Sequence, residues 1–386
     1  MELTVVLAGI PVRLSLRSPA YAACFQPFCT EADPVAAVRV PEDALKEAAP
    51  HYEAGTTPEQ VEYLELGPRV CDALLPYGRI LFHGAAILWR GKPRLVLQIN
   101  HGMTEHSGRY DTLAAALAEH GIACAAFDLR GHGRNPGSRT CADMGPDGWE
   151  QSLSDLQRFC ERLRESFPGV PLGMLGFSLG SFLLRDALCR GMVAPAGVIL
   201  AGTGTQPGAV LAVIQAIVRG QLRRAKPGGT TPLVQKLSFG AYNRKFAPNR
   251  TRADWLCADE EALDRYCADP LCRPDISAAL FLELLSAMRR TGGKRALAGW
   301  NRCPILLLSG ADDPVGAMGS GVRQLGAAME RAGLPVQTVL LPGARHDIFH
   351  EEAGGAAAQV RSRILRFCET ILAESEKPRN QSPAEK

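Results

Sequence analysis

The stretch Leu172-Gly-Met-Leu-Gly-Phe-Ser-Leu-Gly180 is an apolar run that ends in the pattern G-x-S-x-G. This pattern is typical of a nucleophile elbow, a sharp turn from a buried strand into a helix that exposes the serine hydroxyl at its apex. Gly176 and Gly180 suit so tight a turn, because a side chain at either position would collide with the neighbouring strand or helix. A pattern of only five positions often occurs by chance. The interpretation therefore also depends on the helical pattern of residues 179–190 and on catalytic partners further along the chain.

The composition indicates a globular protein with a large core. The chain has 386 residues, 46% apolar and 22% charged, which suits a large α/β domain with an insertion or a small companion and excludes wholesale disorder. The net charge of +3 argues against a nucleic-acid partner. The 12 cysteines include no C-x-x-C, so we expect reduced thiols and a cytoplasmic location.

The sequence patterns predict neither a signal peptide nor a membrane span. The N-terminus is apolar but begins Met1-Glu-Leu and lacks the basic region of a signal peptide. No run of about 18 apolar residues occurs, so we expect no transmembrane helix.

Residues 1–76 differ in pattern from the rest and are predicted to form a small α+β accessory region. Strand-like pieces span 3–16 and 36–40, and 58–75 has a helical pattern broken at Gly67-Pro68. Together with Tyr77-Gly-Arg-Ile-Leu-Phe-His-Gly-Ala-Ala86, this region resembles the N-terminal segment of HPr-kinase-like nucleotide-binding proteins. No G-x-x-x-x-G-K-[ST] follows, so kinase activity does not carry over.

Alternating strands and helices over residues 77–204 and 297–374 predict a doubly wound, mostly parallel sheet. A hairpin is expected from 80–82 and 85–89, and further strands at 94–100, 122–129, 172–177, 196–201, 304–310 and 336–341. Helices are expected at 110–120, 149–167, 179–190, 321–333 and 356–374. In such a sheet the active-site loops follow the carboxyl ends of the strands.

The alternation stops over residues 205–296, which we interpret as a helical lid inserted above those strand ends. Residues 209–218 are apolar nearly all round, a basic Gly/Pro-rich break follows at 223–231, and helical patterns occupy 232–239, 260–267 and 276–289. The polar residues 375–386 are expected to be a disordered tail.

An elbow serine is a poor nucleophile unless a histidine accepts its proton and an acid orients that histidine. In α/β-hydrolases the chain order is serine, acid, histidine, on loops that follow late strands. Either Asp312 or Asp313 can supply the acid after the strand 304–310. His346, after the strand 336–341, is the expected base for Ser178, and His350 is the expected polar partner or surface residue.

An oxyanion hole needs two backbone N–H groups aimed at the oxygen that gains charge. Leu179 follows the serine directly, and Met103 lies in the loop after the strand 94–100, so these two residues are the expected donors. This chemistry requires neither a metal nor a cofactor.

His101-Gly-Met-Thr-Glu-His-Ser-Gly-Arg-Tyr110 resembles the HGxxEHSGRY signature of monoacylglycerol lipases and lysophospholipases, the serine aminopeptidase or "hydrolase 4" branch of α/β-hydrolases. Asp128-Leu-Arg-Gly-His-Gly133 is similar to the D-x-R-G-H-G loop of that branch, and the lid segment 239–250 resembles its bacterial members. The resemblance covers about residues 78–372 and favours Asp313 as the acid. Ser181, Asn135 and the Phe177-Ser178-Leu179 centre depart from the family pattern, which leaves the shape of the pocket open.

The resemblance implies an α/β-hydrolase fold and a serine hydrolase that cleaves esters with a single acyl chain, monoacylglycerol or lysophospholipid. A lid rich in apolar residues also implies transient contact with a membrane surface. Two alternatives stay open. The chain could be an aminopeptidase or amidase, with Asp259, Glu260 and Glu261 available to hold an amine, or a scaffold in which residues 1–76 recruit a partner and the hydrolase is secondary.

Overall fold

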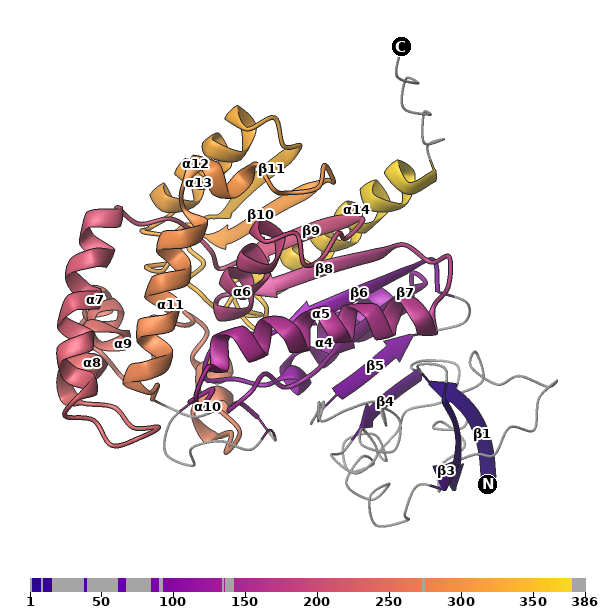
Figure 1. Ribbon diagram of the computed structural model, residues 1–386, viewed down its shortest axis with the longest axis horizontal. Coiled ribbons are helices and arrows are strands. Elements are labelled where there is room, and N and C mark those ends of the chain that lie inside the picture. Colours follow the sequence, from indigo (N-terminus) through magenta and orange to yellow (C-terminus); the bar gives the residue numbers. More distant parts are fainter. Residues whose placement is uncertain are drawn as a thin grey trace.

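The fold is built on an eight-stranded sheet (Figure 1). The computed structural model describes residues 93–133, 135, 142–272 and 275–376, together with the backbone of five strands before residue 90. The strand order is β11-β10-β9-β8-β6-β7-β5-β4, and the first six strands are mutually parallel. They are β6 (Leu95–Asn100), β7 (Ile122–Ala126), β8 (Leu172–Phe177), β9 (Gly197–Ala201), β10 (Ile305–Gly310) and β11 (Val336–Leu341). The predicted α/β-hydrolase fold is thus confirmed.

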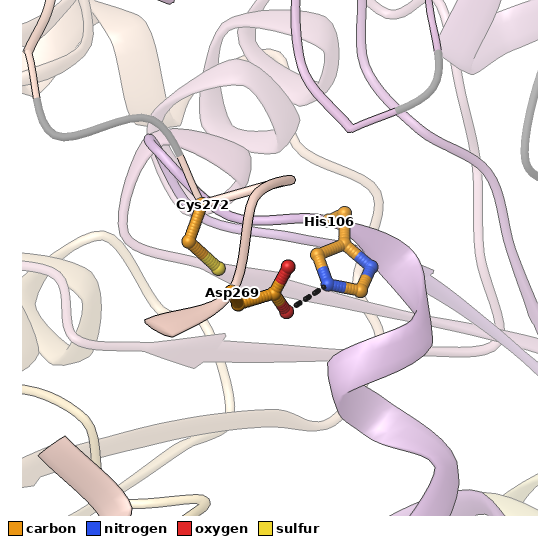
Figure 2. A group of neighbouring side chains, drawn as sticks. All are labelled: His106, Asp269 and Cys272. Atoms are coloured by element: carbon orange, nitrogen blue, oxygen red, sulfur yellow. Dashed lines mark hydrogen bonds and ion pairs between the residues drawn. The ribbon is translucent and has the colours of Figure 1, made fainter. Parts of the chain in front are cut away.

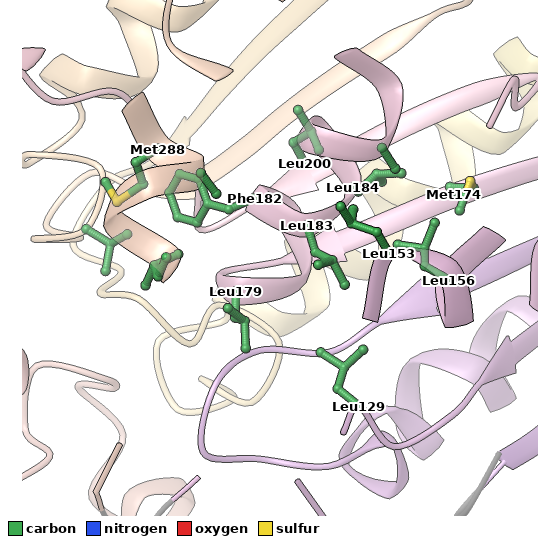
Figure 3. Packing of buried hydrophobic residues seen from close by; sticks show 14 of the residues in the cluster. Leu129, Leu153, Leu156, Met174, Leu179, Phe182, Leu183, Leu184, Leu200 and Met288 are labelled. Atoms are coloured by element: carbon green, nitrogen blue, oxygen red, sulfur yellow. The ribbon is translucent and has the colours of Figure 1, made fainter. Parts of the chain in front are cut away.

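Helices cover both faces of the sheet, which explains why the central strands are buried throughout and mostly apolar. One face packs against α4 (Asp111–Ala118) and α14 (Ala356–Glu376). The other packs against α5 (Gly148–Ser166), α6 (Leu179–Cys189) and α13 (Ser320–Arg331). Helix α6 is buried along nearly its whole length. Its Leu183 and Leu184 lie near leucines of α5 and the sheet, whereas Phe182 lies beside Met288 of α11 (Figure 3).

The insertion between β9 and β10 forms a group of helices beyond the carboxyl ends of the parallel strands (Figure 1). It contains α7 (Gly208–Leu222), α8 (Pro232–Leu237), α9 (Phe239–Asn243), the 3-10 turn η3 (Arg244–Phe246), α10 (Glu260–Ala268), α11 (Ala278–Thr291) and α12 (Lys294–Leu297). Helix α11 packs against both α6 and α7. No helix of the described residues is long and apolar enough to cross a membrane.

The N-terminal region departs from its prediction at one element. A hairpin of β1 (Glu2–Leu7) and β2 (Ile10–Ser15) pairs with β3 (Val38–Arg39), as the strand-like patterns indicated. Residues 62–66, predicted to be helical within 58–75, instead form strand β4 (Glu62–Leu66), which is antiparallel to β5 (Ala85–Trp89) of the main sheet. Leu64 and Leu66 are two residues apart, the period of a strand, and Gly67-Pro68 follows directly. The predicted strand 80–82 lies outside the described residues.

The C-terminal helix extends two residues further than predicted. Ser375 and Glu376, expected at the start of a disordered tail, belong to α14. Residues 377–386 lie outside the described part of the chain.

A buried carboxylate joins three helices of the fold. Asp186 in α6 accepts hydrogen bonds from the indole N–H of Trp149 in α5 (2.8 Å), from Arg290 in α11 (2.5 Å) and from Arg190 (3.1 Å). Burial alone would raise the pKa of Asp186, but these three donors hold it below its ordinary value. The ionised carboxylate therefore contributes to the stability of the fold.

Replacing Asp186 by asparagine should lower the free energy of unfolding by about 1–3 kcal/mol at neutral pH, because an amide satisfies the buried donors less well. The contribution of the carboxylate is complete above its unfolded pKa of about 4 and is lost as the pH falls through the lower folded pKa. Urea denaturation measures both effects. Glu150→Gln is the matched control, because Glu150 binds Arg190 with a side chain that is 61% exposed, and an equal loss in both variants would contradict the prediction.

Candidate active site

The elbow predicted from G-x-S-x-G lies between strand β8 and helix α6. Ser178 occupies a left-handed backbone conformation (φ 49°, ψ −116°) that side chains rarely adopt, and its N–H donates to the carbonyl of Ala201 (2.9 Å). A Cβ atom on Gly176 would lie 2.6 Å from the carbonyl oxygen of Gly180, and one on Gly180 would lie 2.1 Å from that of Asn100. Both glycines are therefore required by close backbone contacts.

The structure brings Ser178, His346 and Asp313 into one chain of hydrogen bonds. The Nε2 atom of His346 lies 2.9 Å from Oγ of Ser178, and its Nδ1 atom lies 2.9 Å from Oδ2 of Asp313. Asp313 is fully buried, and it also accepts from the hydroxyl of Ser309 (3.0 Å) and the N–H of Val315 (2.8 Å). A carboxylate held in this way accepts a hydrogen bond from the N–H at Nδ1, which keeps the proton on Nδ1 and leaves the Nε2 lone pair for the serine hydroxyl.

The structure distinguishes Asp313 from Asp312 as the acid and His346 from His350 as the base. Asp312 is half-buried beside Asp313 and donates its N–H to the carbonyl of Ala344 (3.0 Å). His350 lies away from Ser178, with Nδ1 2.7 Å from Oδ1 of Asp347 and Nε2 2.6 Å from the carbonyl oxygen of Arg109. Asp313 and His346 are thus the members of each pair that the fold places at the serine.

The two predicted oxyanion donors lie at the start of α6 and in the loop that follows β6. Leu179 is the first residue of α6, where a backbone N–H has no acceptor within the helix. Met103 lines the same cavity as Ser178, in the loop that follows β6. A Cβ atom on the preceding residue, Gly102, would lie 2.9 Å from the ring of Phe177, so this loop also approaches the elbow closely.

A buried ion network, which was not predicted from the sequence, supports the Met103 loop. The carboxylate of Glu105 accepts from the N–H of Gly102, from the hydroxyl of Tyr110 (2.8 Å) and from Arg109 (2.5 Å). Arg109 also donates to Asp347 (2.7 Å), the neighbour of His346. Burial would raise the pKa of Asp347, but His350 and Arg109 hold it well below its usual range. The loop that follows β6 is thereby tied to the histidine loop.

His101 fixes the other side of this loop. Its Nε2 atom accepts from the N–H of Leu129 (2.9 Å) and its Nδ1 atom lies 2.7 Å from the carbonyl oxygen of Gly102, so Nδ1 carries the proton. Burial lowers the pKa of His101, which favours this neutral form. The D-x-R-G-H-G loop thus supports the oxyanion region and does not reach Ser178.

A second histidine joins this region to the inserted helices. One side-chain atom from each of His106, Asp269 and Cys272 lies within 4.8 Å of the others (Figure 2). Nε2 of His106 lies 2.8 Å from Asp269, and its Nδ1 accepts from the N–H of Gly108 (3.2 Å). Because Nδ1 accepts, the proton is on Nε2 and is donated to Asp269, so the lone pair of His106 is not directed at a metal. We interpret the group as a link between the core and the insertion.

The departures from the family pattern have structural roles. The hydroxyl of Ser181 donates to the carbonyl of Ser178 (2.6 Å) inside the first turn of α6. The ring of Phe177 lies 4.9 Å from that of His346, and Asn135 donates to the carbonyl of Asp128 (3.3 Å). None of the three displaces a residue of the serine, histidine and aspartate chain.

The cavity above Ser178 is narrow and mostly apolar. Its volume is about 40 Å³, and the insertion supplies half of its lining residues, among them Phe239, Trp255, Phe281 and Met288. Binding cavities for small molecules usually measure about 300–1,000 Å³, so the insertion closes the site in this conformation. A second cavity of about 1280 Å³ lies at the amino ends of the parallel strands, and no predicted site residue lines it.

The chain matches a known family model and is similar to several known proteins. A sequence model of the family described as "Serine aminopeptidase, S33" (Hydrolase_4) matches residues 91–353. The chain is 28% identical to a monoglyceride lipase of Mus musculus over 266 residues, 67% of this chain and 76% of that protein. It is 26% identical to a monoglyceride lipase homolog of Monkeypox virus over 281 residues, 72% of this chain and 90% of that protein.

Among solved structures, the chain is similar to a highly thermostable carboxyl esterase from Bacillus coagulans in complex with glycerol. The sequence identity is 25% and the TM-score 0.68, over 75% of this chain and 94% of that chain. The family match includes the inserted helices and leaves the predicted accessory region 1–76 outside.

Replacing Glu105 by glutamine should lower kcat about 10- to 100-fold with little change in KM, because the neutral side chain holds Gly102 and the adjacent Met103 N–H less firmly. Steady-state hydrolysis of a soluble p-nitrophenyl ester measures both constants. Glu119→Gln is the control, since Glu119 is exposed at the end of α4. A kcat equal to that of the wild type in a folded Glu105→Gln protein would show that the network does not support the site.

Proposed function

Because the chain belongs to the serine aminopeptidase S33 (Hydrolase_4) family of α/β-hydrolases, we propose that it is a serine hydrolase of carboxylic esters with a single acyl chain, monoacylglycerol or lysophospholipid. The observation that carries the proposal is the continuous hydrogen-bond chain from Ser178 through His346 to buried Asp313. A cytoplasmic location stays a prediction.

In the proposed reaction, the Oγ atom of Ser178 attacks the ester carbonyl while Nε2 of His346 takes its proton. Asp313 stabilises the imidazolium that forms, and the N–H groups of Met103 and Leu179 bind the oxyanion. The C–O bond to the alcohol then breaks, and His346 gives its proton to the leaving alcohol. Water, activated by the same histidine, attacks the acyl-enzyme and releases the acid.

The apolar lining of the cavity favours a substrate with an acyl chain. Phe239, Phe281, Leu284 and Met288 line the space next to Ser178. Each methylene group transferred from water to such a wall gains about 0.8 kcal/mol. Since the cavity is too narrow for a long chain, we propose that part of the insertion moves to admit the substrate.

The outer surface of the insertion suits contact with a lipid surface. Val210, Val213 and Ile217 are 48%, 61% and 38% exposed, and their spacing of three and four residues places them on one face of α7. Exposed apolar side chains in a row on one helix favour an interface over bulk water. We propose transient contact with substrate aggregates through this face.

The aminopeptidase alternative has less support. Asp259, one of the acids available to hold an amine, caps α10 by accepting the N–H of Ala262 (3.1 Å) and also accepts the N–H groups of Glu352 and Ala353. Glu260 and Glu261 are exposed on the first turn of α10. Comparing hydrolysis of prolyl amides with that of glycerol monoesters separates the two activities.

Replacing Ser178 by alanine should reduce kcat on p-nitrophenyl esters by about 10⁴-fold or more, because no other group is placed to attack the carbonyl. Labelling by a fluorophosphonate probe should disappear in the same variant. Ser154→Ala, which removes a half-buried serine hydroxyl that bonds to the carbonyl of Glu150 within α5, is the control. An active Ser178→Ala protein would contradict the mechanism, and an unlabelled, inactive wild type would favour the scaffold alternative.

A further inference from the structure

The segment of residues 251–257, between η3 and α10, lies against the histidine loop. Its Trp255 ring is centred 5.0 Å from the imidazole of His346 with an interplanar angle of 31°. The ring of Phe177 lies 4.9 Å from the same imidazole at 33°. His346 is therefore held between an aromatic ring of the core strand β8 and one of the insertion, and it is 1% exposed.

Hydrogen bonds join the same segment to both neighbours of His346. The guanidinium of Arg345 donates to the carbonyls of Asp254 (2.5 Å) and Cys257 (3.1 Å). The N–H of Asp347 donates to the carbonyl of Leu256 (2.6 Å). Residues on each side of the histidine are thus fixed to the insertion.

Contacts within the insertion fix the position of this segment. The N–H of Trp255 donates to the side-chain oxygen of Asn243 (3.0 Å), and Asp254 accepts from the N–H and the hydroxyl of Thr251 (2.9 and 2.5 Å). Phe239 of α9 stacks on the indole at 5.2 Å and 22°. The indole is 4% exposed, so its position is determined by packing on the insertion side as well as by His346.

We propose that residues 251–257 form a strap that positions the general base, with Trp255 as the positioning residue. The proposal rests on the proposed hydrolase function. When His346 accepts the proton of Ser178, the imidazolium lies over two aromatic ring faces, which attract a cation. The strap also keeps the ring from rotating away from the Ser178 hydroxyl, so the base is assembled only while this part of the insertion is docked.

Trp255→Leu keeps the position apolar and removes the ring face. We expect kcat on p-nitrophenyl butyrate to fall about tenfold while KM changes less than about twofold. The rate of fluorophosphonate labelling should fall by the same factor, because labelling uses the same base. Trp255→Phe should restore most of both rates. A KM increase with an unchanged labelling rate would overturn the proposal, since it would make Trp255 only a wall of the pocket.

Trp300→Leu is the matched control. Trp300 is also nearly buried (6% exposed), but its indole N–H faces Sγ of Cys189 on α6, away from the cavity. Any loss common to both variants reports destabilisation, which thermal melting measures directly. A folded Trp255→Leu protein with wild-type kcat would overturn the proposal.

Arg345→Met tests the strap if Trp255→Leu fails to fold, because it removes the guanidinium donors and leaves the indole in place. We expect a lower kcat together with faster hydrogen exchange of the Asp347 amide, and faster exchange with unchanged kcat would overturn the proposal. Wild-type protein that neither hydrolyses esters nor reacts with the fluorophosphonate would contradict the proposed function itself. Active wild type with an equally active Trp255→Leu variant would contradict only the role of the strap.

Discussion

The close approach of helix α6 to the end of strand β6 is the constraint on which the site depends. The N–H of Gly180 donates to the carbonyl of His101 (3.1 Å), and a Cβ atom on Gly180 would lie 2.1 Å from the carbonyl oxygen of Asn100. This contact brings the start of α6 beside the loop that carries Met103, and it leaves Ser178 at the apex of the turn in a left-handed conformation. The unfavourable backbone conformation of Ser178 persists because the buried helix and sheet on either side of it fix the course of the chain.

The elements of the core could be predicted because their signals are local. The central strands are fully buried and mostly apolar, and the serine, acid and histidine follow strands in the order that this fold requires. Choosing between Asp312 and Asp313 needed more than local pattern, because the two carboxylates are adjacent in sequence and only one faces His346. Strand β4 was missed for a related reason: five residues with two leucines fit either period, and only pairing with β5 decides between them.

The ion network could not be predicted from the sequence because it joins distant residues. Arg109 and Asp347 are separated by 238 positions, and nothing in either segment identifies the other as its partner. The only available signal was the E-H-S-G-R-Y run itself, whose charged residues fall next to a predicted oxyanion loop. Buried charges are costly without partners, so a dense charged motif beside an active-site loop is a reason to expect a network, although not its geometry.

The insertion is attached to the core so firmly that it does not behave as one hinged lid. Arg185 in α6 donates to the carbonyls of Gly204 (2.8 Å) and Thr291 (3.2 Å), which lie where the insertion begins and where α11 ends. Burial lowers the pKa of Arg185 to about 10, so it is still charged at neutral pH and binds both carbonyls as a cation. Since α11 is anchored at this point, and residues 251–257 are bonded both to the histidine loop and to α9, we expect a motion that admits substrate to come mainly from α7 and α8. These helices also carry the exposed apolar face, so the part of the insertion free to move is the part suited to meet a lipid surface.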